Sequence, residues 1–232
     1  MAGAGSFVVL DRLQPSWWLR LRYPLEYRQL VVGYARIYHL DPALVAAVVY
    51  EESRFDAETR SPAGAVGLMQ LLPATAQGIA DRTGGSRFRL SDLLDPDINL
   101  RYGCWYLQHL QQKYADRPNG DELALAAYNA GQANVDRWIA ATPPGRAAPI
   151  RFAATRQYVA DVRRLQAIYR RAYGSELAAA AAPAATVKDP VAQPISPGLC
   201  RMGSSRAFRA GSPGAALCLC APAFSCSPSR AS

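Results

Sequence analysis

Residues 41–55 read DPALVAAVVYEESRF, and this run predicts a helix with a well-marked start. Asp41 can cap the first free amide groups, and Pro42 suits the first turn because its missing N–H costs nothing there. At about 100° per residue, the large apolar side chains of the run cover an arc of roughly 140°. Glu52 falls near the middle of this arc and Glu51 near its margin, so the two glutamates are not equivalent.

A carboxyl group on an apolar helix face is expected to have a raised pKa, because burial disfavours its charged form. A glutamic acid that is still protonated near neutral pH can protonate a glycosidic oxygen. Glu52 is therefore a candidate catalytic acid. The alternative is that Glu52 is an ordinary helix residue paired with an arginine such as Arg54.

The fold class predicted from the whole pattern is all-α. The chain has 232 residues, half of them hydrophobic, which is enough for one substantial core. From residue 24 to about residue 174 the pattern is helix after helix, and long amphipathic helices are predicted over residues 100–114 and 158–169. Further helix starts are marked by Asp95-Pro96 and Asp121.

The composition changes at about residue 175. Ala, Pro, Ser and Gly then dominate without periodicity, so residues 175–232 are predicted to form a low-complexity, disordered tail. Four of the five cysteines lie in this tail: Cys200, Cys218, Cys220 and Cys226. No histidine or structured context accompanies them, so we predict no metal site there. Cys104, inside a predicted helix, is interpreted as a small buried residue.

The formal net charge of +8 is spread over the body and the tail. A diffuse basic surface suits anionic polymers in general, including those of cell walls. Nucleic acid is not predicted as a partner, because the arginines form no dense stripe. The two histidines, His39 and His109, are interpreted as ordinary residues of separate helices rather than as a ligand pair.

Residues 1–22 are predicted to be an N-terminal extension and a candidate remnant of an anchor region. They lack the charged start and apolar core of a secretion signal, and no stretch reaches membrane-spanning length. Residues 16–23 combine aromatic rings with arginines, which suits peripheral association with a membrane interface. The alternative is that these rings pack on the domain.

Three motifs follow one another along the chain: Glu52-Ser53-Arg54-Phe55, Gly67-Leu68-Met69-Gln70 and Ala127-Tyr128-Asn129-Ala130-Gly131. With Tyr23-Pro24-Leu25 and Thr155-Arg156-Gln157-Tyr158-Val159, they resemble the catalytic domain of the soluble lytic transglycosylases. The resemblance covers residues 23–174 and implies a lysozyme-like, single globular domain. It implies cleavage of the β-1,4 bond between N-acetylmuramic acid and N-acetylglucosamine in peptidoglycan, without metal or cofactor. A monomer that acts outside the cytoplasm, on peptidoglycan glycan strands, is expected.

The resemblance also assigns roles to single positions. Glu52 matches the family's single catalytic acid and base, and Ser53 its supporting neighbour. Tyr128 and Asn129 match groove residues that hydrogen-bond near the scissile sugar. Ser61 sits where a small polar residue commonly faces the glycan.

Residues 67–70 match a strand-like wall of the sugar groove in the same family. Gly67, Leu68, Met69 and Gln70 are thus expected to bind substrate: the glycine lets the backbone approach, and Met69 offers a soft apolar surface. Gln70 offers a donor and an acceptor to substrate amides. Ala154 is a departure, because many relatives have a glutamate there, so turnover or substrate preference can differ.

With a single acid, the implied reaction is intramolecular. Glu52 protonates the leaving oxygen and then accepts a proton from the C6 hydroxyl of the muramic sugar, giving a 1,6-anhydro end without water. The nucleophile is tethered to the same sugar, which supplies proximity. A hydrolytic muramidase would need a second carboxylate, for which Asp56 is the close candidate in sequence. An inactive glycan-binding module is the other alternative, and Ala154 would fit it.

Overall fold

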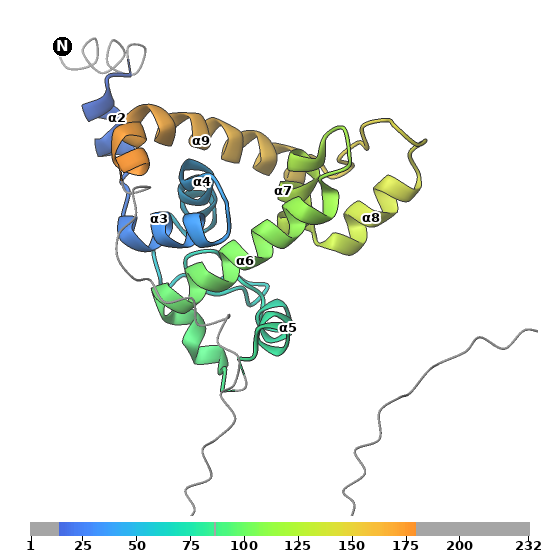
Figure 1. Cartoon of the computed structure of the whole chain (residues 1–232), viewed down its shortest axis with the longest axis horizontal. Coiled ribbons are helices and arrows are strands. Elements are labelled where there is room, and N and C mark those ends of the chain that lie inside the picture. The colour runs from blue at the N-terminus through green and yellow to red at the C-terminus, as the bar shows by residue number, and fades with distance from the viewer. Residues whose placement is uncertain (1–13, 86, 180–232) are drawn as a thin grey trace, which may run out of the picture. The chain divides into compact units, whose positions relative to one another are not determined.

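The computed structural model describes residues 14–85 and 87–179, and this part of the chain is helical (Figure 1). The elements follow in the order α2 (Ser16–Arg22), α3 (Arg28–Ile37), α4 (Pro42–Ser53), α5 (Pro73–Thr83), the 3-10 helix η1 (Leu90–Leu94), α6 (Pro96–Tyr114), α7 (Gly120–Ala130), α8 (Gln132–Ala140) and α9 (Ala153–Ala179). Extended pairing among the described residues is limited to two isolated bridges, which join Val66 to Arg60 and to Leu71. The predicted all-α fold class is confirmed.

Helix α4 is the central element, and its residues 43–49 are all buried. Figure 1 shows α9 running across α4, and these two helices form the most extensive helix pair of the structure. The predicted cap is present: Asp41 Oδ1 accepts from the Ala43 amide at 3.0 Å, and Pro42 is the first helical residue. Asp41 Oδ2 also accepts from Gln166 and Arg170, so one carboxylate both caps α4 and ties it to α9.

The predicted helix over residues 41–55 ends two positions early. Arg54 and Phe55 have left-handed backbone angles, with φ of 53° and 67°. Phe55 nevertheless remains buried, because the reversal of the chain returns its ring to the core against Tyr169. The chain therefore leaves α4 immediately after Glu52 and Ser53, and it turns toward the loop that carries residues 67–70.

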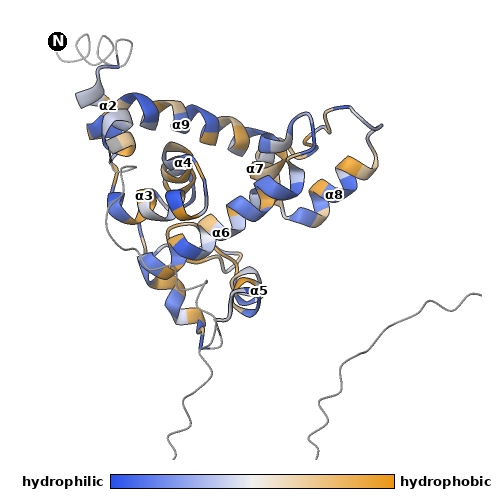
Figure 2. Cartoon of the chain, in the orientation of Figure 1, coloured by the Kyte–Doolittle hydropathy of each residue, from blue (hydrophilic) through white to orange (hydrophobic). Residues whose placement is uncertain are grey.

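The long helices were predicted correctly. Residues 100–114 lie within α6, where Cys104 is fully buried as expected. Residues 158–169 lie within α9, on which hydrophilic and hydrophobic segments alternate in Figure 2. The apolar side chains form a main core around α4 and a smaller one between α5, η1 and α6.

Helix α9 continues past the boundary predicted at residue 174 and is described as far as Ala179. The extra turn is held by Leu177, which is buried, and by Glu176, whose carboxylate pairs with Arg20 at 2.7 Å and with Arg28 at 2.9 Å. The rest of the predicted tail, with its four cysteines, lies outside the described residues, as do residues 1–13.

Two further expectations concern the histidines and the membrane. His39 is not a helix residue: it follows α3 in a turn with φ of 53°. His109 does lie in α6, where its ring stacks on Trp105.

Among the described residues, no helix has the length and apolar character to cross a membrane. In α2, Leu19 is buried in the core, whereas Trp17 and Leu21 are 58% and 73% exposed.

Candidate active site

Glu52 lies in the last turn of α4, partly buried against α9. Its Oε1 accepts a hydrogen bond from the Tyr158 hydroxyl at 2.7 Å. Burial raises the pKa of Glu52 to about 7, although the hydrogen bond from Tyr158 acts in the opposite direction. The predicted rise is therefore confirmed, and it has the predicted cause: a carboxyl group on the core-facing side of an apolar helix.

Glu51, one position earlier, is exposed. Partial burial raises the pKa of Glu51 and the charge of Asp161 raises it further, whereas the positive charge of Arg54 acts in the opposite direction. Arg54 itself donates to the Tyr50 hydroxyl at 3.0 Å and lies over the Tyr50 ring. The alternative in which Arg54 pairs with Glu52 is thus wrong, because the group that contacts Glu52 is a neutral phenol.

Ser53 stabilises the end of α4, next to Glu52. It is buried, and its Oγ lies 2.9 Å from the Leu68 carbonyl oxygen and 3.2 Å from that of Val49. The hydroxyl therefore ties the end of α4 to the loop that follows it. The expectation that Ser53 supports Glu52 fits this position, whereas a direct contact between Ser53 and substrate does not.

Residues 67–70 form a tight turn rather than a strand-like wall. Gly67 has φ of 80°, and a Cβ at this position would lie 2.4 Å from the Leu93 carbonyl oxygen, so the turn requires glycine. Leu68 and Met69 are both 0% exposed. The expectation that Met69 offers an apolar surface to sugars is wrong, because its side chain fills the core against Gly103.

Asn99 holds this turn in place and was missed in the sequence. It is 0% exposed in α6, and its Oδ1 accepts from the Met69 amide at 2.8 Å. Its Nδ2 donates to the carbonyl oxygens of Val66 at 2.9 Å and Leu93 at 2.8 Å. The available signal was a polar amide on the apolar face of a predicted helix, since such a group is buried only with partners.

Gln70 and Ser61 are largely engaged with their own loop. Gln70 Nε2 donates to the carbonyl oxygens of Thr59 at 3.0 Å and Gly67 at 2.9 Å. Both amide hydrogens are therefore used, and the Oε1 atom is the part of this side chain still suited to a ligand. Ser61 Oγ accepts from the Ala65 amide at 3.0 Å, which closes the loop over residues 61–65.

Tyr128 connects the turn to α7. Its hydroxyl donates to the Met69 carbonyl oxygen at 2.8 Å, and its ring packs against the Tyr106 ring in a tilted arrangement. Burial raises the pKa of Tyr128 well above its ordinary value, and the nearby charge of Glu52 raises it further. The same two causes act on Tyr158, so both phenols stay protonated and flank one carboxyl group.

A pocket with a volume of about 180 Å³ opens beside Tyr128. It lies between the turn and the end of α7, and it is lined by Gln70, Leu71, Leu72, Thr75, Tyr106, Tyr128, Asn129, Ala130 and Gly131. Three of the predicted site residues, Gln70, Tyr128 and Asn129, thus line one pocket. Glu52 is not among the lining residues, but it is close enough to Tyr128 to raise the pKa of that phenol. Tyr158, which donates to Glu52, was read only as part of a motif.

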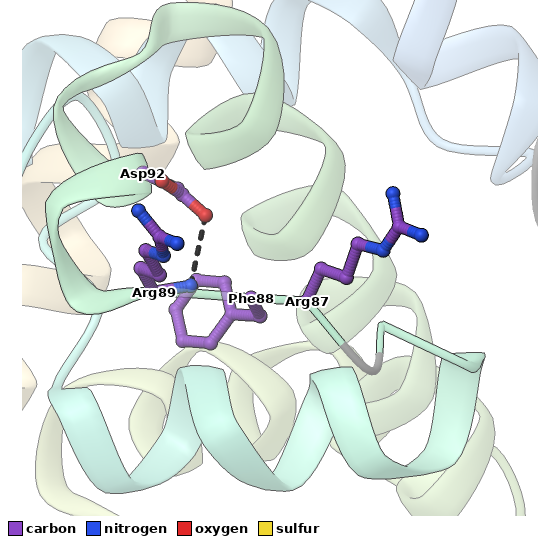
Figure 3. A pocket seen from close by; sticks show the side chains of 4 residues that line it. All are labelled: Arg87, Phe88, Arg89 and Asp92. Carbon is purple, nitrogen blue, oxygen red and sulfur yellow. Dashed lines mark hydrogen bonds between the residues drawn. The ribbon is translucent and has the colours of Figure 1, made fainter.

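A larger hollow of about 550 Å³ lies elsewhere, around Arg87, Phe88, Arg89 and Asp92. In Figure 3 the Asp92 carboxylate faces the Arg89 backbone, whose N–H it accepts at 2.8 Å, while the Arg87 guanidinium points away. No predicted site residue lines this hollow. Within the described residues, no group of three or more His, Cys, Asp or Glu side chains could hold a metal ion.

Asp56, the second carboxylate considered for hydrolysis, is exposed. Its Oδ1 accepts from the Glu58 amide at 2.9 Å, so the side chain stabilises the turn that follows α4. The chain reverses at Arg54 and Phe55 between the two acids. Asp56 therefore serves local backbone structure, in contrast to Glu52.

Comparison with known proteins agrees with this geometry. The family model described as "Transglycosylase SLT domain" matches residues 29–148, more than half of the chain. The soluble lytic murein transglycosylase of Salmonella typhimurium is 34% identical over 165 residues, which cover 68% of this chain and 25% of that protein. The chain thus spans about a quarter of the length of such relatives.

Solved structures give the same result. The 70 kDa soluble lytic transglycosylase of Escherichia coli is 32% identical, with a TM-score of 0.59 over 66% of this chain and 25% of that one. An inactive glutamate-to-glutamine mutant of the lytic transglycosylase Slt from Pseudomonas aeruginosa is 32% identical, with a TM-score of 0.59 over 72% and 27% of the two chains. From its sequence, its helical fold and these matches, the chain belongs to the transglycosylase SLT domain family.

Proposed function

We propose that this chain is a peptidoglycan lytic transglycosylase. It cleaves the β-1,4 bond between N-acetylmuramic acid and N-acetylglucosamine without water and leaves 1,6-anhydro ends. The observation that carries the proposal is Glu52, a partly buried acid with a pKa of about 7 near two protonated tyrosines, one of which, Tyr128, lines a pocket. The names of the relatives support the same reaction.

The pKa of Glu52 suits both halves of such a reaction. A group with a pKa near the working pH can donate a proton in one step and take one back in the next. Tyr158 occupies Oε1, so Oε2 is the oxygen that carries the exchanged proton. Because Tyr158 stays protonated, its hydrogen bond also holds the carboxyl group in one orientation.

The bond changes balance within one substrate molecule. The proton of Glu52 goes to the glycosidic oxygen as the bond from C1 of the muramic sugar breaks, and the N-acetyl group stabilises the positive centre. The C6 oxygen of the same sugar then bonds to C1, and its proton returns to Glu52. The acid is restored, and the tether between C6 and C1 provides the effective concentration of the nucleophile.

A hydrolytic muramidase is less well supported. Hydrolysis by two carboxylates needs a second acid near the scissile bond. Asp56 instead accepts a backbone hydrogen bond in its own turn. An inactive binding module is expected to lack a working acid. Glu52 is present, its pKa is raised, and it accepts a hydrogen bond from the Tyr158 hydroxyl.

Digestion of purified peptidoglycan tests the proposal. Mass spectrometry of the soluble products should show 1,6-anhydro ends, which are lighter than reducing ends by one water. Glu52→Gln should release none, while circular dichroism shows an unchanged helical fold. Reducing ends alone would replace the proposal by hydrolysis, and binding to sacculi without any release would replace it by a binding module.

We further propose that the protein acts outside the cytoplasm, where its polymeric substrate lies, and that it acts as a monomer. Trp17 and Leu21 are spaced one turn apart on α2 and are exposed, which suits contact with a membrane surface. Sedimentation with vesicles of anionic phospholipid should carry the protein down, and Trp17→Ser with Leu21→Ser should reduce the bound fraction. Equal sedimentation of both proteins would contradict a membrane contact at α2.

A further inference from the structure

Thr155 lies in the first turn of α9, and its side chain reaches the end of α7. Its Oγ1 donates a hydrogen bond to Asn129 Oδ1 at 2.9 Å. Thr155 is only 3% exposed, whereas Asn129 is exposed and lines the 180 Å³ pocket. A buried hydroxyl group therefore holds an amide that faces the pocket region.

This contact determines which end of the amide is available. An asparagine side chain has a carbonyl oxygen at one end and an NH₂ group with two donors at the other. Because Oδ1 accepts from Thr155, the Nδ2 atom is turned away from α9. Nδ2 makes no hydrogen bond with the described residues, so two donors remain free.

The other residues of the turn cannot replace this contact. Ala153 and Ala154 have no polar side-chain atoms. Arg156 donates to the carbonyl oxygens of Ile150 at 2.8 Å and Arg151 at 2.9 Å, so it holds the segment before α9. Thr155 is the residue of this turn that can bind the amide of Asn129.

We propose that Thr155 is a positioning residue, which orients Asn129 so that Nδ2 donates to an acceptor on the bound glycan. A carbonyl oxygen of an N-acetyl group is the acceptor class that this amide would take. The inference rests on the proposed function, because it assumes a glycan in the pocket region. An amide that is already oriented loses less rotational freedom when the ligand binds.

Two substitutions separate the donor from the shape of Thr155. Thr155→Val keeps a branched side chain and removes the hydroxyl group, whereas Thr155→Ser keeps the hydroxyl group. We expect Thr155→Val to lower kcat/KM on soluble peptidoglycan fragments about tenfold, and Thr155→Ser to remain within about threefold of the original. The loss should fall mainly on KM, because the amide contacts bound substrate and transition state alike.

A double-substitution cycle tests whether Thr155 acts through Asn129. In an Asn129→Ala background there is no amide to orient, so adding Thr155→Val should cost less than about twofold. The same tenfold loss in both backgrounds would overturn the proposal and leave a general packing role. An unchanged kcat/KM in Thr155→Val, or an equal loss in Thr155→Ser, would also overturn it.

Binding of a tetramer of N-acetylglucosamine, measured by calorimetry, separates this inference from the proposed function. The Kd should weaken about tenfold in Thr155→Val and recover in Thr155→Ser. Should the original protein bind the tetramer but release no product from peptidoglycan, the proposed function fails and the Kd series still decides the role of Thr155. Absence of both cleavage and binding by the original protein would overturn both proposals.

Discussion

The end of α4 and the turn over residues 67–70 lie next to each other, yet their motif residues have different roles. At the end of α4, the Glu52 side chain is partly open and its pKa is raised to about 7. In the turn, the side chains of Leu68 and Met69 are fully buried. The carbonyl oxygens of these two residues accept from the Ser53 and Tyr128 hydroxyls, and the Met69 amide donates to Asn99. Motif residues that lie close together therefore differ in role: Glu52 has the properties of a candidate acid, whereas Leu68 and Met69 stabilise the turn next to it.

The two adjacent glutamates give the largest expected contrast. Glu52→Gln should lower the rate of anhydro-product release by more than about a thousandfold, because it removes the acid that the proposed mechanism requires. Glu51→Gln should change the rate less than about threefold, since Glu51 is exposed at the margin of the helix face. Rates are compared on the same peptidoglycan preparation. Comparable losses in both variants would contradict the distinction between the two positions.

Asn99 tests the supporting side of the comparison. Asn99→Leu removes the side-chain partner of the Met69 amide and of the Val66 and Leu93 carbonyl oxygens, although the Val66 oxygen still accepts from the Leu71 amide. We expect the free energy of unfolding to fall by about 3 kcal/mol, measured by urea denaturation. A loss below about 1 kcal/mol would mean that the turn does not depend on this amide.

The burial of Glu52 also predicts how stability depends on pH. Its pKa rises from 4.5 to about 7 in the folded protein, so folding favours the protonated form. The stability associated with that form is fully present below pH 4.5 and is lost as the pH rises to 7. Relative to Glu52→Gln, the original protein should therefore lose up to about 3 kcal/mol between these limits.

Urea denaturation of both proteins at pH 4.5 and pH 8 measures this difference. Glu51→Gln is the comparison variant, because it removes an exposed carboxylate whose charge is the smallest of the three causes that act on the pKa of Glu52. A gap between the original protein and Glu52→Gln that stays constant with pH would show that Glu52 is hydrated and ionised in the same way as in the unfolded chain.

Tyr158 connects α9 to the acid and should have a smaller effect. Tyr158→Phe removes the hydrogen bond that lowers the pKa of Glu52, so this pKa should rise further. Activity needs protonated Glu52 in the free enzyme, so the alkaline limb of the kcat/KM profile should move to higher pH. We also expect kcat to fall about tenfold as the carboxyl group loses its fixed orientation. An unshifted alkaline limb would contradict the role of this phenol.

The sequence predicted the parts of the site that depend on local periodicity. The position of Glu52 on α4 follows from the helical repeat of the apolar residues around it, and so does the rise of its pKa. The pairing of Glu52 with Tyr158 could not be predicted in this way, because 106 residues separate the two. Contacts between distant segments depend on how α4 and α9 pack, and no local pattern encodes that packing.

The same limit explains the error at Met69. A motif aligned to a groove does not say which side chains face the groove, and at residues 67–70 the turn directs the side chains of Leu68 and Met69 inward. Met69→Leu should then change kcat/KM less than about twofold and cost at most about 1 kcal/mol of stability, as a swap of similar volume in a core does. Leu72→Ser is the matched control, because Leu72 lines the pocket and is 45% exposed. A larger loss of affinity for the N-acetylglucosamine tetramer in Met69→Leu than in Leu72→Ser would mean that the turn opens to ligand and that Met69 contacts sugar.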